Sequence, residues 1–88
     1  MYDWEPTERR NIPGYVYIFR GDNGLHKIGS TKHITRRMWE VSHYTGVKLE
    51  LFFCVKTNDM NFLEKKLHKH FKDKRVYNEW FYLEEGEL

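Results

Sequence analysis

Four polar side chains in this sequence are of the types that a phosphodiester-cutting site needs. Tyr17 stands in an apolar run, and ten residues later Lys27 stands directly before an Ile-Gly pair. Arg37 and Glu64 follow at greater separation. A phenol can orient or deprotonate a water molecule, a guanidinium binds phosphate oxygens bidentately, and a carboxylate can hold a divalent cation. The set therefore suggests chemistry on a phosphate ester.

Each of these residues also has a structural interpretation that the sequence leaves open, and for Arg37 it is an exposed basic start of a helix. Tyr17 could be a core residue, because its neighbours in the run are apolar. Lys27 could point outward from a half-buried strand, and Glu64 could pair on a helix surface with His68 four residues later. A phenol has an ordinary pKa near 10, so Tyr17 could act as a base only if cations such as Lys27 and Arg37 lowered that pKa.

The elements that must position these residues begin with a predicted hairpin. Residues 15–20 are apolar on both faces, which predicts a strand covered on both sides. The Gly-Asp-Asn-Gly sequence over 21–24 is typical of a tight turn, and residues 25–30 then read as the returning strand. Gly29 near the end of that strand suggests either a close approach to the backbone or a place where a side chain would block a ligand.

The rest of the chain predicts two helices and a third strand. Residues 34–44 have helical apolar spacing, and Gly46 is expected to end that helix. Residues 48–57 are β-rich and predict a strand at the centre of the sheet. Asp59 is expected to cap a second helix over 60–71.

The order of these elements is β-β-α-β-α, followed by a short closing element over 80–83. This order predicts an α/β (α+β) sandwich with a central three-stranded, mostly antiparallel sheet flanked by helices. The length of 88 residues fits one domain, which we place at 13–88 after a polar arm over 1–12.

Composition narrows the class of protein. Hydrophobic residues make up 40% of the chain and charged residues 32%, as in a folded domain rather than a disordered one. The single cysteine, Cys54, excludes an internal disulfide, and the usual zinc-ligand spacings are absent from the sequence. No apolar run approaches the roughly 20 residues of a membrane span. We therefore expect a cytoplasmic protein without a membrane partner.

The distribution of charge favours a nucleic-acid partner. The net charge is only +2, but acidic residues gather at the two ends and basic residues in the middle. A central basic zone is typical of phosphate contact, although a solvated helix face explains part of it equally well.

Six residues near the proposed site are candidates for substrate contact: Tyr15, Gly29, Lys32, His33, Arg36 and His43.

The order and spacing of these motifs resemble the GIY-YIG nuclease superfamily over about residues 13–83. Residues 15–18 (YVYI) match its GIY strand and residues 27–29 (KIG) match its YIG strand. Arg37, eight residues after the glycine of the second motif, falls at the arginine of the first helix, and Glu64 falls at the metal-binding glutamate.

The end of the chain narrows this resemblance. Residues 79–81 (EWF) match a closing signature of a compact, phage-rich branch in which KIG replaces YIG. The lysine at position 27 therefore departs from the name of the superfamily but not from the pattern of that branch.

The resemblance implies a metal-dependent DNA endonuclease. Glu64 would hold a single Mg²⁺ or Mn²⁺, and Arg37 would stabilise charge in the transition state. Tyr17 would activate a water molecule, with help from Lys27 or His68. DNA is the implied partner, and a homodimer or a partner protein that supplies specificity are further candidates.

One departure from the superfamily keeps a second function class open. A histidine or tyrosine one helical turn after the arginine often assists in the superfamily, whereas Val41 stands there in this chain. His33 or His43 would have to replace it. The alternative function is a catalytically weak or inactive module on the same scaffold, which binds nucleic acid or a partner protein.

Overall fold

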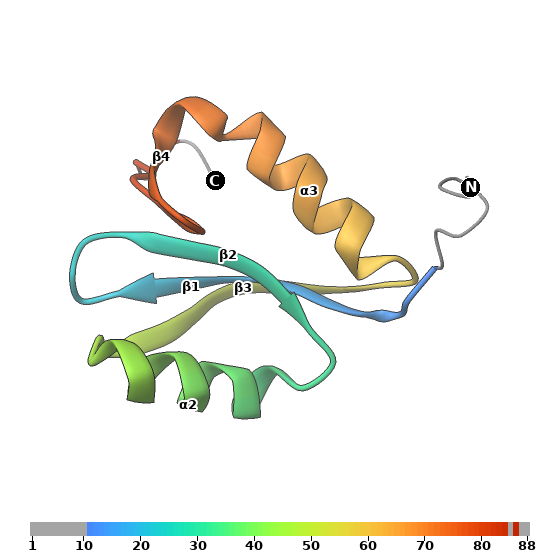
Figure 1. Ribbon diagram of the computed structural model, residues 1–88, viewed down its shortest axis with the longest axis horizontal. Coiled ribbons are helices and arrows are strands. Elements are labelled where there is room, and N and C mark those ends of the chain that lie inside the picture. Colours follow the sequence, from blue (N-terminus) through green and yellow to red (C-terminus); the bar gives the residue numbers. More distant parts are fainter. Residues whose placement is uncertain (1–10, 85, 87–88) are drawn as a thin grey trace, which may run out of the picture.

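Two helices pack on opposite sides of an antiparallel sheet in the computed structural model of the chain (Figure 1). The structure describes residues 11–84 and 86, so the expected arm over 1–12 lies almost wholly outside the described residues. The elements in chain order are β1 (Gly14–Gly21), β2 (His26–Thr31), α2 (Ile34–Thr45), β3 (Leu49–Thr57), α3 (Met60–His70), the 3-10 helix η1 (Lys72–Lys74), β4 (Arg75–Tyr77) and β5 (Trp80–Phe81).

The sheet has five strands in the order β3-β1-β2-β5-β4, and every neighbouring pair is antiparallel. The α+β class and the element order are confirmed. The expected count of three strands is wrong, because the closing segment adds β5 and β4 beyond β2. The expected central place of β3 is also wrong, since β1 lies between β2 and β3 and β3 forms an edge of the sheet.

The interior position of β1 follows from its two apolar faces. Ile18 belongs to a core cluster that is completed by Ile28, Phe71, Phe81 and Leu83. Tyr17 belongs to a second cluster with Phe19, Val41 and Trp80, and residues of α2 pack against it. Alternate side chains of one strand therefore supply both cores, as the sequence predicted for a strand covered on both sides.

Strand β3 is apolar but exposed. Its register with β1 shifts between Ile18 and Phe19, where the chain forms a bulge or irregularity. Leu51 and Phe53 of β3 are 43% and 46% exposed. A bulge twists an edge strand away from further pairing, which is one means by which proteins protect exposed sheet edges.

The helix termini follow the predicted signals. Gly46 has φ 76°, in the left-handed region, and its N–H donates to the Ser42 carbonyl at the end of α2. The Asp59 carboxylate accepts a hydrogen bond from the backbone N–H of Phe62 at the start of α3. Within the described part of the chain, no helix has the length and apolar character needed to cross a membrane.

Candidate functional site

The site lies at the stretch of β2 that extends past β5. Strand β5 pairs with β2 only at His26 and Lys27, and the Glu79 carbonyl then accepts a hydrogen bond from the N–H of Ile28 at 3.1 Å. Side chains from both faces of the sheet reach this region: Tyr17 and Lys27 lie on the α2 side, and Ser30 bonds to α3. The short β5 therefore leaves this part of β2 open for a functional site.

Tyr17 is fully buried and lies against Gly29, its partner across the β1–β2 ladder. The Tyr17 ring stacks on Phe19, with 3.9 Å between the ring centroids and 14° between the planes. A Cβ atom at position 29 would lie 2.6 Å from Tyr17 Cζ and closer still to the phenol oxygen. Only glycine leaves room for the ring, so the close approach is the one of the two interpretations from the sequence that the structure supports.

The environment of Tyr17 keeps its phenol protonated. Burial raises the pKa of Tyr17 to about 12, although a hydrogen bond from Arg37 opposes this rise. The phenol therefore stays neutral near pH 7. Tyr17 is suited to orient a water molecule or donate to an oxygen, and the role of general base, which the sequence left open, is disfavoured.

Arg37 of α2 binds the Tyr17 phenol from the helix side. This hydrogen bond raises the pKa of Arg37, against the opposing effect of burial, and Arg37 Nη1 also donates to Glu40 Oε1 at 3.4 Å. Arg37 Nε is buried and has no hydrogen-bond partner among the described residues. An unpaired buried donor costs about 1–3 kcal/mol, so a bound anion at this guanidinium would be stabilising.

Lys27 is buried rather than pointing outward, with only 6% of its surface exposed. Its Nζ donates to Glu79 Oε1 at 2.6 Å and lies 5.9 Å from the centroid of the Trp80 ring. Burial alone would raise the pKa of Glu79, but the hydrogen bond and charge of Lys27 lower it. Glu79 is therefore an ionised carboxylate held in place by a buried ammonium.

Glu64 of α3 reaches the same region from the other face of the sheet. Its Oε1 accepts a hydrogen bond from Ser30 Oγ at 2.5 Å, and burial raises its pKa. The neighbouring Glu79 carboxylate adds to the rise in the pKa of Glu64, whereas the hydrogen bond from Ser30 opposes it. One ligand atom each from Glu64, His68 and Glu79 lie within 4.8 Å of one another. This spacing suits a metal ion.

His68 is better placed to position the site than to bind the metal. Its Nε2 is 2.9 Å from the Ile28 carbonyl oxygen, and its Nδ1 is 3.2 Å from Arg75 Nη2. A carbonyl only accepts and a guanidinium only donates, so Nε2 carries the proton and Nδ1 accepts. Both nitrogens are engaged, which leaves Glu64 and Glu79 as the residues of this group that could hold a metal ion. Paired carboxylate oxygens suit Mg²⁺ or Mn²⁺.

A hollow of about 310 Å³ adjoins Arg37. Two predicted substrate residues, His33 and Arg36, line it together with Arg37, which was predicted to be catalytic. The remaining lining residues are Ser30, Thr31 and Glu40. This cationic hollow is the right kind of surface for phosphate groups.

Three further predicted substrate residues do not line this hollow. Tyr15 is half-buried two residues before Tyr17, Lys32 is exposed, and His43 stacks on Trp39 on α2. Val41, where the superfamily often has an assisting residue, is fully buried in the core. His33 and His43, the two residues expected to replace it, are both exposed and lie outside that core.

Glu79 and Ser30 are site residues that the sequence reasoning did not assign. The pairing of Glu79 with Lys27 spans 52 residues of chain, so spacing alone gave no sign of it. The clue in the sequence was the EWF motif over 79–81, in which an acidic residue stands directly before two aromatic residues that the structure buries.

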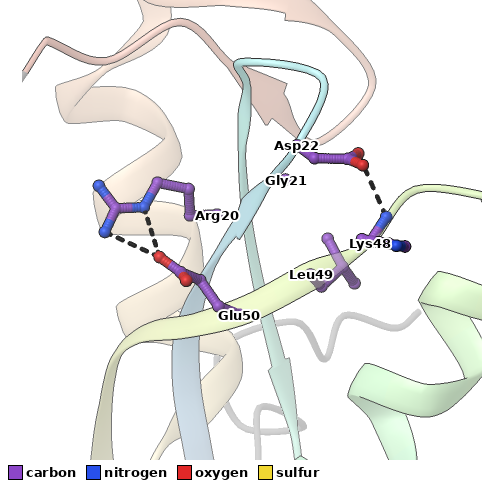
Figure 2. A pocket seen from close by; sticks show the side chains of 6 residues that line it. All are labelled: Arg20, Gly21, Asp22, Lys48, Leu49 and Glu50. Atoms are coloured by element: carbon purple, nitrogen blue, oxygen red, sulfur yellow. Dashed lines mark hydrogen bonds and ion pairs between the residues drawn. The ribbon is translucent and has the colours of Figure 1, made fainter.

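A second hollow, also about 310 Å³, has a structural explanation (Figure 2). Arg20 Nη2 lies 2.8 Å from Glu50 Oε2, and the Lys48 backbone N–H donates to Asp22 Oδ1 at 3.3 Å. These contacts join β1 and the β1–β2 turn to the start of β3. The polar groups that line this hollow are therefore paired with one another.

Residues 14–88 match the T5orf172 domain, and the chain belongs to this family. No curated protein and no solved structure matches the chain. Membership of this phage-associated family is consistent with a nuclease-like or nucleic-acid-binding module.

Proposed function

We propose that this chain is a metal-dependent endonuclease of the GIY-YIG type that hydrolyses DNA phosphodiester bonds. The observation that carries the proposal is the gathering of complementary groups at the open stretch of β2. A protonated phenol, a guanidinium with an unpaired donor and two neighbouring carboxylates reach it from four separate segments. A cationic hollow adjoins them. A purely structural cluster does not need all of these groups together.

Glu64 and Glu79 would hold the metal ion. One ligand atom of each residue lies within 4.8 Å of the other, so a divalent cation between them would face two carboxylates. When bound, Mg²⁺ or Mn²⁺ supplies Lewis-acid stabilisation of charge that develops on the phosphate oxygens. Lys27 holds Glu79 in position, and Ser30 does the same for Glu64.

The protein's own side chains then orient the reaction. Water supplies a hydroxyl group to phosphorus, the P–O bond to the leaving group breaks, and the leaving oxygen takes up the remaining proton. Tyr17, protonated at neutral pH, orients the attacking water through its hydroxyl group. Arg37 binds the phosphate oxygens as negative charge increases on them.

A plasmid-nicking assay tests this proposal. Wild-type protein with Mg²⁺ or Mn²⁺ should convert supercoiled DNA to the nicked form, and EDTA should stop the reaction. Glu64→Gln and Tyr17→Phe should each slow nicking by about 100-fold or more. Glu50→Gln is the matched control, because Glu50 is an exposed carboxylate that pairs with Arg20 on the sheet edge. No nicking by the wild type, or unchanged nicking by both site variants, would refute the proposal.

The burial of Val41 favours a second candidate function. Because that position belongs to the core, it cannot supply an assisting polar group, and the module could bind nucleic acid without cutting it. In that case the plasmid would stay intact while DNA binding weakened with salt, with a log-log slope of about −0.9 for each phosphate contact.

A further inference from the structure

Helix α2 presents a pair of stacked rings to solvent, outside the site described above. Trp39 and His43 lie one turn apart, with 4.9 Å between their ring centroids and 7° between their planes. Trp39 is nevertheless 64% exposed. The stack fixes the orientation of a large flat ring without burying it, and an exposed tryptophan of this kind is characteristic of binding surfaces.

The rings share their side of α2 with a cation. Arg36 precedes Trp39 by three residues, so the two are neighbours on the helix surface. The Arg36 side chain is 73% exposed and lines the hollow beside Arg37. Arg36 Nε lies 3.5 Å from Glu40 Oε2 and Arg37 Nη1 lies 3.4 Å from Glu40 Oε1, so two guanidinium groups share one carboxylate and the hollow keeps a positive balance. The opposite side of the helix packs on the core through Ile34, Met38 and Val41. A ligand of this surface therefore meets positive charge and a flat aromatic face side by side.

We propose that Trp39 and His43 form a stacking platform for an unpaired base of a nucleic-acid strand whose neighbouring phosphate occupies the Arg36–Arg37 hollow. A nucleotide strand carries flat rings and negative charges in regular alternation, which matches this surface. Bases inside a duplex already stack on their neighbours, so the platform selects single-stranded, frayed or flipped bases. The inference rests on the proposed function and names the substrate class of the same site.

A double-mutant cycle between protein and strand tests the platform. Binding is measured by fluorescence anisotropy in EDTA, using Glu64→Gln protein so that the strand is not cut. The probes are a labelled single strand of mixed sequence and an abasic strand of the same length. Trp39→Ala should weaken binding to the base-bearing strand by about 5- to 150-fold, which is the usual range for one stacked base. Binding to the abasic strand should be unchanged.

Further variants separate stacking from loss of structure. Trp39→Phe keeps an aromatic ring and should restore most of the affinity, whereas Trp39→Leu should behave like Trp39→Ala. Tyr82→Ala is the matched control, since Tyr82 is an exposed aromatic residue (54%) in the segment after β5. It should leave binding to both strands unchanged.

Several results would overturn the platform. These are equal loss on both strands, no loss on the base-bearing strand, an equal loss on duplex DNA, or a change of oligomeric state in Trp39→Ala without a change in affinity. Failure of the Glu64→Gln protein to bind the base-bearing strand would overturn it too. A failure of the proposed nuclease activity can be distinguished from a failure of the platform. It would appear as uncut plasmid in the nicking assay, which does not change the result of these binding measurements.

Discussion

Substitution of Gly29 by alanine tests whether β2 is built around the Tyr17 ring. The added Cβ would lie 2.6 Å from Tyr17 Cζ and 3.1 Å from Cε1. An ordinary contact needs about 3.4 Å, so the ring or the strand must move by at least about 0.8 Å, and by more to clear the phenol oxygen, which lies closer still. The Tyr17 ring is fully buried and stacked on Phe19, which leaves it little room to move.

The expected loss of stability follows from this crowding. Overpacking in a close-packed core costs about 1–3 kcal/mol. For a domain of this size each kcal/mol lowers Tm by about 4–8 °C, so Gly29→Ala should melt about 4–24 °C below the wild type. Displacement of the phenol should also slow nicking, because an error of about 1 Å in a catalytic group can reduce a rate by about 100-fold.

A double-mutant cycle measured by thermal unfolding isolates the contact between Gly29 and the Tyr17 ring. It compares the wild type, the two single variants and the double variant. Tyr17→Leu removes the ring, so Gly29→Ala should cost less stability in that background, with a coupling of about 1 kcal/mol or more. Gly86→Ala is the control, since a Cβ at Gly86 meets no atom within 4 Å. Additive effects of the two substitutions, or an equal loss from Gly86→Ala, would show that the ring and Gly29 do not constrain each other.

Three further predictions follow from the buried polar groups. Glu79→Gln should destabilise the fold by about 1–3 kcal/mol in urea unfolding, because it leaves the Lys27 ammonium buried without its anion. Adding Lys27→Met should recover part of this loss. A larger loss in the double variant would contradict the pairing. Burial lowers the pKa of His26, with a smaller contribution from Arg20, so the unfolded chain binds the proton more readily and stability should fall as the pH drops below about 6.5. Tm measured from pH 7.5 to 5.5 should therefore decline less in His26→Phe than in the wild type, and identical profiles would reject the assignment. Arg37→Lys should slow nicking by about tenfold or more with little change in Tm, since lysine cannot reproduce a bidentate guanidinium, and full activity would exclude that role.

Local features of the fold were predictable from the sequence because their causes are local. Gly46 and Asp59 are helix-end residues whose chemistry is fixed by type, and both lie where the sequence placed them. Strand β1 was recognisable as an interior strand from its two apolar faces. The place of β3 was not, because its run of apolar residues reads like a central strand although the structure leaves it exposed at the edge.

The candidate site was predictable only in part, and for a related reason. The sequence identified Tyr17, Lys27 and Glu64 by type and spacing, but their protonation depends on burial and on partners far along the chain. The phenol keeps its proton because the core surrounds it. Lys27 is buried because Glu79 lies beside it, 52 residues away in sequence. Long-range pairs of this kind become visible only once the fold brings them together.

Anomalous diffraction from crystals of this protein soaked in Mn²⁺ would show directly whether Glu64 and Glu79 bind a metal ion. We predict one main peak between the carboxylates of Glu64 and Glu79, at about the 2.0–2.2 Å expected for oxygen ligands of a small divalent ion. Tyr17 and Arg37 should lie beside the same volume. No peak at saturating Mn²⁺, or peaks only at other carboxylates while Glu79 stays paired solely with Lys27, would contradict a metal site at these two carboxylates.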